Sequence, residues 1–108
     1  MKKQKLDDMT RGWFIGNFEP SVLKTKDFEV GVLTHKKGEV WKKHYHKLGT
    51  EYNVLIKGKM FICDTEINEG EIFTIDPYEI ADPVFLEDCT VVCVKTPSVP
   101  GDKFFPQE

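Results

Sequence analysis

Residues 38–58 read GEVWKKHYHKLGTEYNVLIKG, and this stretch holds two histidines and a glutamate in close succession, His44, His46 and Glu51. Two imidazole nitrogens and one carboxylate oxygen form a donor set that suits manganese, iron, nickel or zinc. Three protein ligands leave coordination positions open, which a catalytic metal requires and a structural metal does not. The stretch therefore predicts an open metal site.

The spacing within this stretch also predicts its local structure. Side chains two positions apart project from the same face of a β-strand, so a strand over 40–46 places both histidines on one face, together with Lys42. If the chain then turns and continues as a strand over 51–57, the carboxylate of Glu51 can face the same interior. We therefore expect a hairpin that brings the three ligands together.

The rest of the chain is dominated by short runs of aromatic and β-branched residues separated by Gly, Pro, Asn and Asp, which is typical of strands and turns. No window shows a sustained helical period. The expected strands are 13–18, 28–35, 40–46, 51–57, 60–64, 71–75, 84–87 and 90–96. Seven or eight such strands predict an all-β sandwich or barrel. Its expected core residues are Trp41, Phe61, Ile62, Phe73, Ile75, Phe85, Val92 and Val94.

The stretch resembles the first sequence motif of the cupin superfamily, G-x5-H-x-H-x3/4-E-x6-G. Gly38, His44, His46, Glu51 and Gly58 meet every fixed position of that motif. The resemblance covers about residues 28–96. It implies a cupin barrel, which is a double-stranded β-helix or jelly roll, often dimeric and with a ligand pocket in its mouth.

The expected organisation is one domain over residues 1–108. An N-terminal edge strand over about 12–19 precedes the barrel, and a Pro-containing tail over 97–108 lies extended across it. An exposed strand edge favours pairing with another chain, so we expect a homodimer.

The second cupin motif, G-x5-P-x-G-x2-H-x3-N, begins correctly at Gly70 and then departs from the family pattern. Asp76 occupies the proline position, and Ala81 occupies the position of the third histidine. Asp82 is a candidate replacement ligand, although neighbouring residues of a strand project to opposite faces. The fourth ligand of the usual cupin site is therefore missing from its expected position.

Three interpretations of the triplet remain open. In the first, His44, His46 and Glu51 bind a divalent metal. In the second there is no metal, and one histidine acts as a general base whose tautomer is held by Glu51. In the third, the triplet is a remnant in a barrel that only binds or scaffolds. Asn53 shares the face of Glu51 and is a candidate substrate contact. Lys95 would suit an anionic ligand if its face is interior, and is otherwise a surface lysine.

The functional hypothesis is an enzyme that acts on a carbohydrate-like substrate or a keto or hydroxy acid, with isomerase or epimerase chemistry favoured over oxygenase chemistry. The alternative is a non-catalytic ligand-binding or regulatory cupin without metal. The basic residues form neither a helical stripe nor an aromatic platform, which argues against a nucleic-acid partner. No apolar run approaches membrane-spanning length, and the charged start MKKQKLDDMT lacks the apolar region of a signal peptide. We therefore expect a cytoplasmic protein without a membrane partner.

Three cysteines, Cys63, Cys89 and Cys93, form an odd set without a CxxC pair. This count argues against a disulfide framework and against a zinc knuckle. If residues 89–95 form a strand, Cys89 and Cys93 project to the same face. We expect them to be buried as small apolar side chains.

Overall fold

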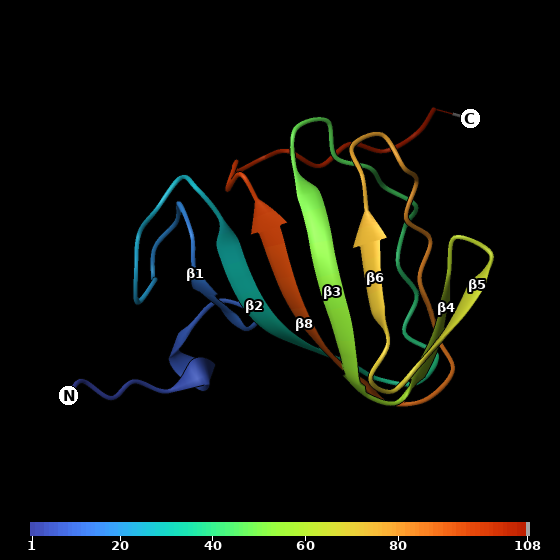
Figure 1. Ribbon diagram of the computed structural model, residues 1–108, viewed down its shortest axis with the longest axis horizontal. Coiled ribbons are helices and arrows are strands. Elements are labelled where there is room, and N and C mark those ends of the chain that lie inside the picture. Colours follow the sequence, from blue (N-terminus) through green and yellow to red (C-terminus); the bar gives the residue numbers. More distant parts are fainter. Residues whose placement is uncertain (108) are drawn as a thin grey trace.

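The computed structural model describes residues 1–107, and these residues are almost entirely β-structure (Figure 1). One three-residue 3-10 helix precedes eight strands within them. The elements are η1 (Leu6–Asp8), β1 (Trp13–Ile15), β2 (Glu29–His35), β3 (Thr50–Lys57), β4 (Lys59–Ile62), β5 (Thr65–Asn68), β6 (Ile72–Ile75), β7 (Val84–Phe85) and β8 (Cys89–Thr96). The all-β prediction is confirmed. No helix among the described residues has the length and apolar character needed to span a membrane.

The strands form two antiparallel sheets. The larger has the order β1-β2-β8-β3-β6, and Figure 1 shows these five strands side by side. The smaller has the order β5-β4-β7. In the larger sheet, Asn53 of β3 and Gly31 of β2 both pair with Cys93 of β8, which fixes the register of the three central strands. The predicted edge strand is present as the short β1, at one edge of this sheet.

One apolar core fills the space between the two sheets. Its members come from both layers, as expected when two sheets pack face to face. They are Leu55, Met60, Ile62, Ile67, Ile75, Ala81, Phe85, Cys89 and Val91, with Trp41 and Phe73 packed against them. The core prediction is thus confirmed for Ile62, Ile75 and Phe85, while Trp41 and Phe73 are partly buried against the core.

Three core predictions are wrong, and strand alternation explains each. In β4 the inward positions are Met60 and Ile62, so Phe61 between them is 39% exposed. In β8 the inward side chains alternate from Cys89, so Val92 and Val94 lie on the outer face and are half-buried. Both faces of β8 are apolar in sequence, so composition alone does not distinguish the inner face from the outer.

The expected hairpin of residues 40–46 with 51–57 is also wrong. Both edges of β3 are occupied, one by β6 and the other by β8, which leaves no edge for a further partner. Residues 40–46 instead join the rest of the fold through isolated backbone bridges, which pair Val40 with Val84, His44 with Ala81 and Tyr45 with Phe104. Trp41 faces the core while Lys42 is exposed, so Lys42 does not share the face of the histidines.

A further difference concerns the smaller sheet, and the motif glycine Gly58 forms the turn that leads into it. Sequence reasoning missed β5, whose only buried residue is Ile67, because four residues with one inward apolar position give little pattern. Gly58 has φ +101° and a Cβ there would lie 2.4 Å from the carbonyl oxygen of Asp88. This turn between β3 and β4 therefore excludes any side chain at position 58.

The C-terminal segment crosses the ends of β8 and β3 (Figure 1). Phe104 exchanges two backbone hydrogen bonds with Tyr45, each 2.9 Å long. The hydroxyl oxygen of Ser98 accepts the N–H of Asn17, which also connects this segment to the N-terminal region. The tail thus lies against the segment that carries the two histidines.

Candidate metal centre

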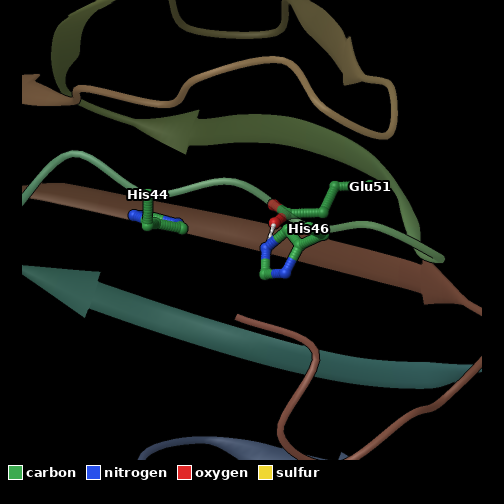
Figure 2. A group of neighbouring side chains, drawn as sticks. All are labelled: His44, His46 and Glu51. Carbon is green, nitrogen blue, oxygen red and sulfur yellow. Dashed lines mark ion pairs between the residues drawn. The ribbon is translucent and has the colours of Figure 1, made fainter. Parts of the chain in front are cut away.

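The two layers meet at the predicted ligands. His44 and His46 lie on the segment 40–46, which has no regular strand and packs on the side of the smaller sheet. Glu51 lies near the start of β3 in the larger sheet (Figure 2). One ligand atom from each residue can be chosen so that the three lie within 4.8 Å of one another. Both histidines are buried and Glu51 is half-buried. The structure therefore brings the three residues together, by contact between layers and not by a hairpin.

His46 has hydrogen-bond acceptors on both ring nitrogens. Its Nδ1–H donates to the backbone carbonyl of Asp102, and its Nε2 lies 2.7 Å from Oε2 of Glu51. Burial by itself lowers the pKa of His46, but the hydrogen bonds to Glu51 and Asp102 outweigh it and raise the pKa above 6.5. Without a metal, the imidazolium form satisfies both acceptors.

His44 is set up differently. Its Nδ1 lies 3.1 Å from the carbonyl oxygen of Lys42, and a carbonyl can only accept, so Nδ1 carries the proton. Burial is the main reason why the pKa of His44 is lowered below 6.5. The neutral ring then leaves the lone pair of Nε2 free, which is the form in which histidine binds a metal.

Glu51 is held by its surroundings as a carboxylate. Burial raises its pKa, but the hydrogen bond and positive charge of His46 outweigh burial and hold the pKa below 4.5. Its Oε1 is 3.5 Å from Nδ2 of Asn53 and 3.7 Å from Sγ of Cys93. Asn53, 5% exposed, thus contacts Glu51 directly, as the shared face suggested.

The three residues fit a divalent cation. Both imidazoles have Nδ1 fixed by a backbone carbonyl, an arrangement that orients histidine ligands in metal sites. At His46 the Nε2 proton occupies the place that a cation would take between the ring and Glu51, so binding a metal would release that proton. The donor set suits manganese, iron, nickel or zinc.

The structure does not bring Asp82 to this cluster. Its Oδ1 accepts the backbone N–H of Cys63 at 3.1 Å, in the turn between β4 and β5. Ala81, its neighbour, pairs with His44 through two backbone hydrogen bonds of 2.7 and 3.1 Å. Side chains of a directly paired couple project from the same face, so position 81 faces the site, where the third histidine of the family pattern would be.

Asp102 supports the candidate site, and sequence reasoning missed it. It is 5% exposed, and its carboxylate accepts the backbone N–H groups of Lys47, Leu48 and Gly49 at 2.9, 3.1 and 2.9 Å. Its carbonyl accepts the Nδ1–H of His46. Asp102 therefore fixes both the loop after the histidines and the ring of His46. The local feature of the sequence, a Gly-Asp pair in the tail, does not indicate which residues this aspartate contacts.

A cavity of about 940 Å³ lies beside the three ligands, within the size range of small-molecule sites. His44, His46, Glu51 and Asn53 line it, and Lys95 does so as well. The side chain of Lys95 is 13% exposed, and its Nζ lies 3.5 Å from Oε1 of Glu29. The interior placement considered for Lys95 is therefore the one that the structure has.

The buried thiols have a simpler environment. Burial, followed by the negative charge of Glu51, raises the pKa of Cys93, so this thiol is a neutral donor to the carboxylate. Burial also raises the pKa of Cys89. Cys63 is exposed, and all three cysteines are free. The expectation of buried small side chains is confirmed for Cys89 and Cys93.

Comparisons with known proteins support the fold. No protein-family model matches the chain, and no curated protein matches its sequence. An uncharacterized conserved protein with a double-stranded β-helix domain from Klebsiella pneumoniae subsp. pneumoniae has a similar structure (TM-score 0.72, 19% identity). That match covers 99% of this chain and 93% of the other. KdgF from Halomonas sp. is also similar (TM-score 0.65, 18% identity, 70% and 74% covered).

DMSP lyase DddQ from Ruegeria pomeroyi is similar over 86% of this chain and 49% of its own (TM-score 0.68, 10% identity). Other similar structures are described as cupin or RmlC-like cupin proteins. At these identities the similarity concerns the fold. Together with the two sheets around one core, it shows that this chain has the cupin fold, a double-stranded β-helix.

Proposed function

We propose that this protein is a metal-dependent enzyme that acts on a small polar substrate, either carbohydrate-like or a keto or hydroxy acid. The observation that carries the proposal is the convergence of His44, His46 and Glu51, with ligand atoms within 4.8 Å, beside a cavity of about 940 Å³. Three protein ligands leave positions at which substrate or water can bind.

A bound divalent metal would supply Lewis acidity, polarising a carbonyl or hydroxyl oxygen of the substrate. The two imidazoles and the carboxylate would hold it, and Asn53 and Cys93 would orient the carboxylate through its second oxygen. We favour redox-neutral chemistry of the isomerase or epimerase type, which needs no co-reactant.

A second candidate is a metal-free barrel that binds its ligand without turnover. The observation that favours it is the His46–Glu51 ion pair of 2.7 Å, which satisfies both side chains without a cation. Ala81 in place of a third histidine points the same way, because it removes one potential ligand from the site.

Turnover assays with a panel of sugars, keto acids and hydroxy acids separate the two candidates. If the protein is the proposed enzyme, His44→Ala and Glu51→Gln should abolish metal-dependent turnover while circular dichroism shows that both variants are folded. Cys63→Ser is a matched control, because it removes an exposed thiol that could hold metal non-specifically. If a ligand raises the Tm but no product forms with any of the added metals, the result would favour the barrel that only binds its ligand.

Homodimerisation and cytoplasmic residence stay predictions. Dimerisation is supported by the outer face of the larger sheet, where Tyr52 and Val30 both pair with Val94 and Val54 pairs with Val92, forming an apolar surface. Light scattering after size-exclusion chromatography would test it, with Tyr52→Lys as the variant. A monomeric wild type would contradict it.

A further inference from the structure

Three cationic side chains line the cavity beside the metal centre: Lys95, Lys103 and Arg11. Lys95 comes from β8, Lys103 from the tail and Arg11 from the segment before β1. Lys95 is the inner cation of the three, whereas Lys103 and Arg11 are exposed at the cavity wall. Three separate parts of the chain therefore contribute positive charge to one cavity.

Lys103 has no ion-pair partner among residues 1–107. Its Nζ lies over the ring of Trp41, 4.8 Å from the centroid, so an aromatic face and not an anion supports the charge. Burial, and then the charges of Arg11 and Lys95, lower the pKa of Lys103. An anion placed between these three cations would relieve that repulsion.

Five of the six carboxylates that line the cavity already have hydrogen-bond or ion-pair partners. Glu29 pairs with Lys95, Glu51 with His46 and Glu19 with Lys24, Glu39 accepts from His35 and Trp41, and Asp102 accepts three backbone N–H groups. Asp7, on η1, is the remaining acid of the lining and is exposed. Among residues 1–107, therefore, neither Lys103 nor Arg11 forms an ion pair with an acid of the cavity wall.

Lys103 is also near the candidate metal centre, because its Nζ lies over the ring of Trp41 and the centroid of that ring is 6.2 Å from the centroid of His44. Its charge adds to burial in lowering the pKa of His44, and it acts on Glu51 as well. A substrate held at His44, His46 and Glu51 could thus place an anionic group of its own beside Lys103.

We propose that the substrate carries a carboxylate, and that Lys103, with Lys95 and Arg11, binds it at the mouth of the cavity. This inference rests on the proposed function and narrows its substrate class to hydroxy or keto acids. Phosphate sites commonly use clusters of backbone N–H groups at a helix N-terminus, and the only helix among the described residues is the three-residue η1. Lysine and arginine side chains bind carboxylates as well as phosphates, and the proposed hydroxy-acid or keto-acid substrate supplies a carboxylate.

Calorimetric titration of the manganese-loaded protein with gluconate and with glucitol tests the proposal directly. The two probes share their carbon chain and differ by a carboxylate in place of a terminal hydroxymethyl group. We expect gluconate to bind more tightly, and its affinity to fall with added salt because the attraction is between charges. Lys103→Met should weaken gluconate binding about fivefold, the loss expected for one partly exposed ion pair, and leave glucitol unchanged.

Lys42→Met is the matched control. Lys42 and Lys103 both place Nζ over the ring of Phe105, at 4.6 and 5.8 Å, but Lys42 does not line the cavity. Equal effects of the two substitutions, or no preference of the wild type for gluconate, would overturn the proposal. Tighter binding of inorganic phosphate than of gluconate would overturn the assignment to a carboxylate.

Metal content measured by mass spectrometry on the same samples separates this inference from the proposed function. If the protein binds none of manganese, iron, nickel and zinc but the carboxylate preference and its loss in Lys103→Met persist, the metal enzyme is refuted and the carboxylate site stands. If manganese binds and the preference is absent, the carboxylate site is refuted and the metal site stands.

Discussion

Replacing Asp102 by Asn tests whether the C-terminal tail positions the metal ligands. The carboxylate accepts three backbone N–H groups, from Lys47, Leu48 and Gly49, through both of its oxygens. An asparagine keeps one acceptor oxygen and presents an N–H₂ group where the other was. At least one backbone N–H then loses its partner and faces a donor.

The magnitude follows from that count. A buried donor without a partner costs about 1–3 kcal/mol, so we expect Asp102→Asn to lower the free energy of unfolding by about 2 kcal/mol. The backbone carbonyl of Asp102 also accepts the Nδ1–H of His46, so a displaced tail changes the orientation of that ring. Loss of such supporting contacts lowers metal affinity by roughly 10–100-fold.

Urea unfolding measures the first quantity, and competition of manganese with a chromogenic chelator measures the second. Asp88→Asn is the control, because Oδ1 of Asp88 accepts the backbone N–H of Lys37 at 2.8 Å, away from the metal centre. It should leave metal affinity unchanged. If Asp102→Asn lowers stability but leaves the manganese affinity equal to that of the wild type, the tail is only a structural support and the reasoning is refuted.

Three other predictions concern the site and the core. Ala81→His should raise manganese affinity about tenfold or more (~1.4 kcal/mol) by supplying a third imidazole opposite His44, and calorimetry showing no gain in a folded variant would contradict this. The raised pKa of His46 and the lowered pKa of Glu51 mean that their ion pair stabilises the metal-free protein fully between pH 4.5 and pH 6.5, and that the contribution of His46 is lost as pH rises through its raised pKa. Manganese affinity should change in the opposite direction over that window, since the cation displaces the proton, and chelator competition across pH would show it. Leu55→Ala should cost about 2–5 kcal/mol in urea unfolding, because Leu55 is 0% exposed at the centre of the core.

The local sequence was sufficient to predict which side chains come together at the candidate metal centre. His44, His46 and Glu51 occupy a motif whose spacing indicates their roles, and Asn53 follows from strand alternation with Glu51. How the ligands are brought together was not predictable in the same way. The hairpin interpretation treated adjacent strands as partners, whereas β3 pairs with β6 and β8, and only long-range contacts decide that.

The residues that support the centre were harder still to predict. Asp102 is separated from His46 by 56 positions, and no local pattern connects an acid in a tail with a distant loop. The position of Lys103 at the cavity was unpredictable for the same reason. For β8, the inner and outer residues are both apolar, so the inward face could be assigned only once Cys93 was seen to pair with Asn53.

Metal content of the purified protein tests the central claim most directly. Untagged wild type, His44→Ala and Glu51→Gln would be prepared without chelator, incubated in turn with manganese, iron, nickel and zinc, freed of excess metal and measured by mass spectrometry. Circular dichroism would confirm that each protein is folded. The account predicts near-stoichiometric binding of at least one metal by the wild type and its loss in both variants. No metal in the wild type, or equal metal in all three proteins, would contradict it.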